Sequence, residues 1–310
     1  MGTNNFTSTA DFILVGLSSD RNTQILLFVL ILLMYIFILV GNLGVIMLVR
    51  LDPHLHKPMY FFLSHLSSVE IWFVTSNIPQ MLNHLLTGRP ELSLIRCALQ
   101  MYLSLSLGSV EALLLGVMAY DRYLAICRPL VYATVMGRCF QFRLASACWA
   151  AGFAIAAVCV SITFQHPFCG PCCIDHFVCE IPMVLKLSCD DTRVTEFAIF
   201  GFAGVVILGP FSVILTSYGL ILSSVLRMRS ATGLRKAFST CSSHLAVVTL
   251  FYGTITFVYI RPQSGTSPVN EKQVAVFYLV VTPLLNPLIY TLRNKDVHEA
   301  MAKVLRRWRL

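Results

Sequence analysis

Charged side chains inside long apolar stretches are the residues of this sequence that could do chemistry. Glu70 and Glu111 are each the single acidic residue of one such stretch, and Asp121 with Arg122 follows the second of them. Two close carboxyl groups cannot both ionise unless a cation lies between them. We therefore expect a structural or cation-linked network, rather than acid/base chemistry, with these members: Asn42, Glu70, Glu111 and Asn286.

Asp121 and Arg122 stand side by side at the end of a membrane-length apolar run. An acid and a base in this place are either a solvated interfacial pair or part of a switch. The sequence contains no nucleophile–base pair and no metal-ligand spacing that would face an aqueous cleft. We expect no catalytic residues and no enzyme activity.

The elements that must position these residues are helices long enough to cross a membrane. The chain has 310 residues, of which 56% are hydrophobic and 12% charged, whereas soluble domains average about 25% charged residues. A span needs about 20 mostly apolar residues. The fold expected is an all-α seven-transmembrane helix bundle with a short amphipathic C-terminal helix. The predicted spans are about 25–50, 58–86, 96–127, 140–164, 196–227, 236–260 and 271–292.

Basic residues set the expected orientation of this bundle. Most of the 23 Lys and Arg residues fall on one side if residues 1–24 are extracellular and the tail 293–310 is cytoplasmic, as the retention of basic loops inside requires. The net charge of +8 is then mostly a property of the inner face, and nucleic-acid binding is not expected. With this topology Asn5, in Asn5-Phe6-Thr7, is a usable glycosylation acceptor.

The segment between the fourth and fifth predicted spans is rich in cysteine. It faces the outer side in the expected topology, where disulfide bonds persist. Zinc or copper ligation together with His166 and His176 is the alternative, and spacing alone does not decide which cysteines pair. The cysteines are Cys169, Cys172, Cys173, Cys179 and Cys189.

Four strings resemble those of vertebrate olfactory receptors, which are rhodopsin-like (class A) G-protein-coupled receptors. The strings are MAYDRYLAICRPLVY at 118–132, LHKPMYFFL at 55–63, KAFSTCSSHL at 236–245 and PLLNPLIY, with its Asn-Pro-x-x-Tyr motif, at 283–290. The outer segments are similar to those of the tetrapod-type (class II) group. The resemblance covers essentially the whole chain and implies a single receptor domain over residues 1–310.

The resemblance implies several bonds and ions. It pairs Cys97 with Cys179 and Cys169 with Cys189, and leaves Cys172 and Cys173 as a second small loop or as free thiols. No cofactor is expected, with a sodium ion near Glu70 and Glu111 as the alternative.

The resemblance also implies a signalling role in the plasma membrane. A small, mostly apolar volatile ligand binds within the bundle, and a stimulatory G protein of the olfactory type then raises cyclic AMP. Asp121 would restrain Arg122 at rest and release it toward Tyr218 on activation. The coupling and switch residues implied are Asp121, Arg122, Tyr123, Tyr218, Lys236, His244, Asn286, Pro287 and Tyr290.

We expect the ligand in the outer half of the bundle, because that level of the third span lines the pocket in rhodopsin-like receptors. Tyr252-Gly253 stands where most of these receptors keep Trp-x-Pro, which puts the usual activation hinge in doubt. The expected ligand-binding residues are Ser104, Leu105, Gly108, Ser109, Phe202, Val206, Tyr252, Ile255, Thr256, Tyr259, Val276 and Leu279.

Two other classes of protein compete with this interpretation. A membrane transporter would need inverted repeats or a polar path through both leaflets, and neither is visible in the sequence. A rhodopsin-like receptor for another small ligand, such as a lipid or metabolite, shares the fold. An amine receptor usually has an acid where this chain has Ser104.

Overall fold

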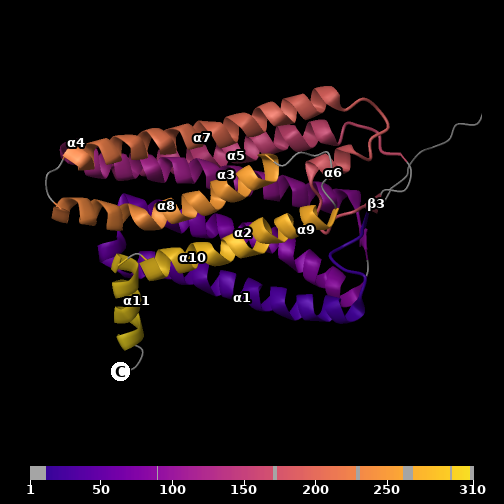
Figure 1. The fold of residues 1–310 in the computed structure, drawn as a ribbon, viewed down its shortest axis with the longest axis horizontal. Helices are drawn as coiled ribbons and strands as arrows, with labels where there is room; N and C mark the ends of the chain where they lie inside the picture. Colours follow the sequence, from indigo (N-terminus) through magenta and orange to yellow (C-terminus); the bar gives the residue numbers. More distant parts are fainter. Residues whose placement is uncertain are drawn as a thin grey trace, which may run out of the picture.

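The computed structural model is a bundle of long helices that lie side by side, with α11 crossing one end (Figure 1). It describes residues 12–88, 90–169, 173–227, 231–260, 268–293 and 295–307, and the side chains of these except 231–240, 256–260, 268–271, 291–293, 295 and 304–307. The all-α bundle predicted from the sequence is confirmed.

In the described part of the chain, seven helical runs form the length of the bundle, and shorter elements join them. The long runs are α1 (Arg21–Leu51), α2 (Pro58–Thr87), α3 (Leu94–Cys127), α5 (Arg138–Thr163), α7 (Arg193–Arg227), α8 (Ala231–Ile260) and the continuous α9 (Pro268–Val276), η2 (Phe277–Val281) and α10 (Thr282–Arg293). The short elements are β1 (Phe12–Leu14), η1 (Pro53–Leu55), β2 (Glu91–Leu92), α4 (Pro129–Val135), β3 (Cys173–Ile174), α6 (Ile181–Leu185) and α11 (Lys295–Arg307).

Five described helical stretches are long and apolar enough to cross a membrane. They are Arg21–Leu51, Leu94–Cys127, Arg138–Thr163, Arg193–Arg227 and Lys272–Tyr290. Helix α2 is as long but more polar, since Ser, His, Asn and Gln recur along it, and Cys241–Ile255 of α8 is a shorter apolar stretch. The chain is a multi-pass membrane protein, and the exact span limits remain predictions.

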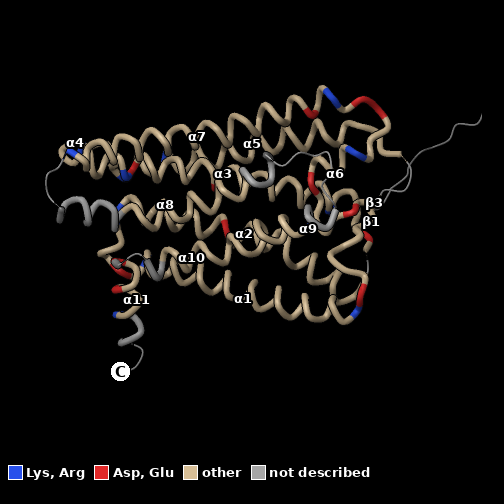
Figure 2. Tube along the Cα trace, in the orientation of Figure 1, with Lys and Arg blue, Asp and Glu red and all other residues tan. Residues whose placement is uncertain are grey.

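Charged residues mark the two ends of the bundle, while the lengths between them are largely uncharged (Figure 2). We call the end that carries β1 and β3 the sheet end, and the end beside α11 the tail end. Between them, large apolar side chains face outward, among them Phe37 at 66% exposed and Val205 at 70%. Such a surface suits lipid, because soluble proteins rarely expose wide apolar patches.

Local sequence signals place the helix ends. The Asp20 side chain caps α1 by accepting a hydrogen bond from the backbone N–H of Thr23 at 2.8 Å, as expected of an N-cap acid. Pro58 lies in the first turn of α2, where its missing N–H is no loss. Gly88 ends α2 with a φ of +68°, a left-handed conformation that glycine adopts without strain.

Helix α3 lies at the centre of the bundle and packs closely against α5. Leu107, Leu114 and Leu115 of α3 are fully buried. A Cβ atom added to Gly152 of α5 would lie 2.6 Å from a methyl carbon of Val110. Glycine is therefore required at position 152 for α3 and α5 to lie this close, as in other tightly packed membrane helices.

A three-stranded sheet, which the sequence pattern does not predict, covers the sheet end. Strand β1 lies between the other two, antiparallel to β2 and parallel to β3. Phe12 and Leu14 point into the molecule and are buried. Strands of two or three residues are too short to show an alternating pattern, so only the tertiary contacts reveal them.

Helix α11 is tied to the tail ends of α1 and α2. Asp296 accepts hydrogen bonds from Lys57 Nζ at 2.8 Å and from the Tyr60 hydroxyl at 3.0 Å. The bond from Lys57 is the main reason that the pKa of Asp296 lies below its usual value. The predicted C-terminal helix is thus present and fixed by polar contacts at its first turn.

Candidate ligand pocket and switch

Two disulfide bonds hold the long segment between α5 and α7 at the sheet end. Cys97 at the start of α3 is bonded to Cys179, with their Cα atoms 5.5 Å apart, and Cys169 is bonded to Cys189 at 5.7 Å. These are the two pairs that the resemblance implied. Cys173 has a free, exposed thiol, and Cys172 lies outside the described residues.

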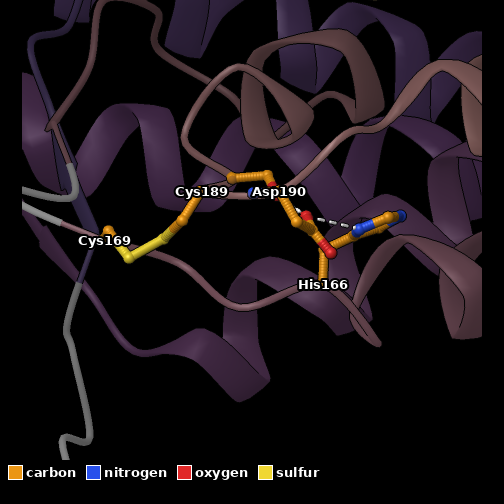
Figure 3. The surroundings of a disulfide bond; sticks show 5 residues. His166, Cys169, Cys189 and Asp190 are labelled. Atoms are coloured by element: carbon orange, nitrogen blue, oxygen red, sulfur yellow. Dashed lines mark hydrogen bonds and ion pairs between the residues drawn. A yellow bond between two sulfur atoms is a disulfide. The ribbon is translucent and has the colours of Figure 1, made fainter.

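A contact between a histidine and a carboxylate lies beside the second disulfide. Asp190 follows Cys189 and contacts His166 Nδ1 at 2.8 Å (Figure 3). The other ring nitrogen of His166 bonds the Thr195 hydroxyl of α7, also at 2.8 Å. A hydrogen bond from Ser188, followed by the one from His166, holds the pKa of Asp190 below its usual value. His166 therefore joins the loop to the start of α7.

The predicted ligand-binding residues of α3 line a face with open space beside it. Ser104, Leu105 and Gly108 are only half-buried although α3 is central. A Cβ atom added to Gly108 would meet nothing within 4 Å. The Ser104 hydroxyl donates to Asn77 Oδ1 of α2 at 2.9 Å, and the Ser109 hydroxyl donates to the carbonyl oxygen of Leu105. This face therefore offers room next to apolar surface.

The predicted residues of α7 and α8 divide between two apolar clusters. Phe202, like Leu105, packs against the cluster under the sheet, whereas Val206 and Tyr252 belong to the main core and Ile255 packs against it. The Tyr252 ring lies against Phe211, with centroids 4.9 Å apart, and its hydroxyl is buried without a hydrogen-bond partner among the described residues. Tyr252 thus brings an unpaired polar atom into an apolar surrounding. The side chains of Thr256 and Tyr259 lie outside the described residues.

The structure places Val276 and Leu279, the last two of the predicted ligand-binding residues, in another part of the bundle. Val276 and Leu279 pack with apolar residues of α1 and α2. Between α9 and α10 the chain is π-helical over Phe277–Val281, which turns the face of the helix relative to a regular α-helix. Regular spacing could not anticipate this rotation.

A small cavity of about 10 Å³ lies between the segment that precedes α1, helix α2 and the loop at the sheet end, and its size suits roughly one water molecule. None of the predicted ligand-binding residues lines it. The residues that do are Gly16, Leu17, Ser18, Met81, His84, Leu85 and Phe177.

Three of the four predicted network residues meet in the core. Asn286 Nδ2 donates to Glu70 and lies 3.5 Å from an oxygen of Glu111. One oxygen of Glu70 and the side-chain oxygen of Asn286 are buried without a hydrogen-bond partner among the described residues. Asn42 is buried too, but its amide donates to Ile38 of its own helix at 3.1 Å. Among the described residues, Asn42 therefore bonds its own helix and none of the other three, and its place in the network stays a prediction.

A histidine links three helices at the tail half of the bundle. His244 of α8 contacts the Tyr218 hydroxyl of α7 at 2.7 Å and the Leu115 carbonyl oxygen of α3 at 3.2 Å. A carbonyl only accepts, so Nε2 carries the proton and Nδ1 accepts from Tyr218. The buried ring therefore holds α3, α7 and α8 together.

Asp121 has a different partner from the one expected. It is fully buried, and it accepts a hydrogen bond from the Tyr132 hydroxyl of α4 at 2.9 Å. No ion pair joins it to Arg122 within the described part of the chain, and Arg122 Nε is buried without a hydrogen-bond partner there. The side chains of neighbours on an α-helix point in different directions, so the restraint expected between these two residues corresponds to no direct contact here.

The other predicted switch residues lie close to this region or outside the described residues. Tyr123 packs in a small cluster with Ile221 and Val225 of α7. Pro287 approaches Gly41 of α1, where an added Cβ would lie 3.2 Å from the proline ring. Tyr290 is buried, whereas the side chain of Lys236 is not described.

Several residues of the site were missed by sequence reasoning. Tyr132 of the string at 118–132 bonds Asp121, and the sequence signal for this contact is an aromatic hydroxyl eleven residues after the acid of an apolar helix. Gln100, three residues after Cys97, accepts a hydrogen bond from the backbone of Cys179. The sequence signal for this contact is a polar residue one turn after a cysteine in an apolar helix.

The fold is shared with a solved receptor structure. The structure of squid rhodopsin matches with a TM-score of 0.69 at 18% identity, covering 93% of this chain and 87% of that one. The bundle therefore has the fold of rhodopsin-like receptors.

Closer relatives identify the family. A family model described as "Olfactory receptor" matches residues 31–307. The dog "Olfactory receptor-like protein OLF3" and human "Olfactory receptor 2F1" are each 47% identical to this chain over 98% of its length and 96% of theirs. Human "Olfactory receptor 2G3" is 46% identical over 98% of this chain and 99% of its own. The chain belongs to the olfactory receptor family, a class of receptors and not of enzymes.

Proposed function

We propose that this protein is an odorant receptor for small, mostly apolar volatile compounds. The observation that carries the proposal is the open space beside Gly108, on a half-buried face of an otherwise closely packed central helix. Leu105, three residues earlier on α3, and Phe202 of α7 both pack against the apolar cluster under the sheet. Membership of the olfactory receptor family supports the same class of ligand.

The size of such a ligand limits its affinity. Burial of apolar surface contributes roughly 25 cal/mol per Å², so a small volatile molecule gains little from contact alone. A ligand shifts a receptor between states only by its difference in affinity for them. Weak binding and broad tuning are the expected result.

Activation of a stimulatory G protein of the olfactory type, with cyclic AMP as the product, is the output that we propose. The contact of Tyr218 with His244 would hold α7 and α8 at rest. Its release would let these helices part and make Arg122, whose Nε has no partner among the described residues, available to Tyr218 and the G protein.

A sodium ion is the proposed occupant of the network around Glu70. The two unpartnered oxygens of Glu70 and Asn286, with the nearby carboxyl of Glu111, form an all-oxygen donor set, which suits a hard cation. The positive charge would also permit two close carboxylates to coexist.

The proposed location is the plasma membrane, with the sheet end outside and the tail end in the cytoplasm. Disulfide bonds at the sheet end support this orientation, because they persist in oxidising compartments. The predicted glycosylation at Asn5, which lies outside the described residues, belongs to the same side.

A cyclic AMP assay against a chemically diverse odorant panel tests the proposal, with Gly108→Val as the matched variant. The added methyl groups would fill the open space and raise the EC50 of large agonists about tenfold, and that of small ones less. Gly201→Val is the control, since Gly201 is exposed on α7 and an added Cβ also meets nothing within 4 Å.

Silence of the wild-type receptor toward the whole odorant panel, at normal surface expression, would contradict the proposed function. A response to lipids or metabolites alone would favour a rhodopsin-like receptor for another small ligand.

A further inference from the structure

Gln100 lies where α3 meets the disulfide-bonded loop at the sheet end. Its side chain is only 4% exposed. Its Oε1 atom accepts a hydrogen bond from the backbone N–H of Cys179 at 3.0 Å. Helix α3 therefore holds this part of the loop twice, by the disulfide to Cys97 and by the amide of Gln100.

Chemistry determines which way the amide of Gln100 points. A backbone N–H can only donate, so the atom facing Cys179 must be the oxygen, and Nε2 must be on the other branch. That nitrogen carries two N–H donors. It is buried and has no hydrogen-bond partner among the described residues, a costly arrangement unless something binds there.

The neighbouring polar side chains already have hydrogen-bond partners. Ser104, one turn further along the same face of α3, donates its hydroxyl to Asn77 Oδ1 at 2.9 Å. Asn77 donates its own amide to the Phe73 carbonyl oxygen at 2.9 Å. Nε2 of Gln100 is thus the unpaired donor of this small group, and Gly108, with its open space, is two turns away on the same face.

We propose that Gln100 Nε2 donates a hydrogen bond to an oxygen of the ligand that only accepts, as in ketones, aldehydes and esters. The carbonyl would lie toward the loop and the hydrocarbon part toward Gly108. This inference rests on the proposed function, because it requires the ligand to occupy the bundle. It makes Gln100 a determinant of ligand class, since a hydrocarbon leaves both donors unpaired.

The test compares carbonyl compounds with hydrocarbons of the same skeleton, namely carvone against limonene and 2-octanone against octane. Cyclic AMP is measured through the wild-type receptor and through Gln100→Met at equal surface expression. The EC50 of the carbonyl agonists should rise about tenfold, as for the loss of one hydrogen bond, while that of hydrocarbon agonists changes by less than about twofold. Gln141→Met makes the same exchange near the tail end of α5, where Gln141 bonds the Met136 carbonyl, and should shift neither class selectively.

Other results of the EC50 comparison would assign a different role to Gln100 or contradict the inference. Equal shifts for both classes, or an unchanged EC50 for the carbonyl agonists, would show that Gln100 only positions the loop or holds a water molecule. A wild-type receptor that answers hydrocarbons and no carbonyl compound would overturn this inference and leave the proposed function intact. If the wild-type receptor responds neither to these compounds nor to the wider odorant panel, both this inference and the proposed function are contradicted. If Gln100→Met does not reach the surface, Gln100→Glu replaces it with the same expectation, because it keeps an oxygen for the Cys179 N–H.

Discussion

The hydroxyl of Tyr218 donates a hydrogen bond to Nδ1 of His244 over 2.7 Å, and the two rings lie nearly parallel at 22°. The same imidazole donates through Nε2 to the Leu115 carbonyl oxygen. One side chain therefore joins α7 and α8 to the central helix, close to the end where a G protein would bind. Its removal should free the helices whose separation we link to activation.

Replacement of His244 by Phe should raise cyclic AMP in the absence of ligand. Phe keeps a flat ring but loses both hydrogen bonds, and a change of about 1.4 kcal/mol in the balance of two states gives about a tenfold shift. The measurement is basal cyclic AMP at equal surface expression. His56→Phe, at an exposed position, is the control, and a basal level equal to wild type in both variants would count against the proposed restraint.

Replacement of Gly152 by Ala should lower the stability of the receptor. The new Cβ would lie 2.6 Å from a Val110 methyl carbon and 2.9 Å from the Ser106 carbonyl oxygen, and overpacking of this kind typically costs about 1–3 kcal/mol. Thermal unfolding of the purified receptor measures the effect. Gly204→Ala on α7, where an added Cβ meets nothing within 4 Å, should be neutral or slightly stabilising, and equal unfolding temperatures would refute the packing argument.

Sodium should stabilise the receptor through Glu70 and Glu111. We expect the unfolding temperature to be higher in sodium chloride than in N-methylglucamine chloride at equal ionic strength. Glu70→Gln should remove this difference, because it takes away one charged ligand of the proposed ion. The same substitution at the exposed Glu91 provides the comparison, and a sodium effect that persists in Glu70→Gln would exclude the site.

The stability of the sheet end should fall in mild acid because of His176. Burial lowers the pKa of this histidine to about 4, and the nearby positive charge of Lys272 acts in the same direction. The unfolded chain, with a pKa near 6.5, takes up a proton first. The free energy of unfolding should therefore decrease as the pH falls from about 6.5 toward 4, by up to about 1.4 kcal/mol per pH unit.

Thermal unfolding at pH 7.5 and pH 5 measures this dependence. A His176→Gln variant should be less stable at pH 7.5 but should lose less on acidification. A slope as steep as that of wild type would assign the dependence to other groups.

Much of this protein could be predicted from the sequence alone, because the properties involved are local or periodic. Membrane-length apolar runs dictate a bundle of helices, since a backbone in lipid must satisfy its own hydrogen bonds. Pro58 and Gly88 mark helix ends by their backbone chemistry. The family strings are runs of consecutive residues, and the two cysteine pairs followed from the resemblance that these strings carry, not from cysteine spacing.

The tertiary structure decided the partners of the polar side chains. Asp121 bonds Tyr132, and Asn42 bonds its own helix. The unpaired Nε2 of Gln100 can be assigned only because the structure shows that Gln100 Oε1 accepts from the Cys179 N–H. The sheet around β1 and the π-helical turn beside Leu279 likewise involve no repeating pattern. Hydrogen bonds depend on distances of a few ångströms between segments far apart in the chain, and spacing along one helix carries no information about them.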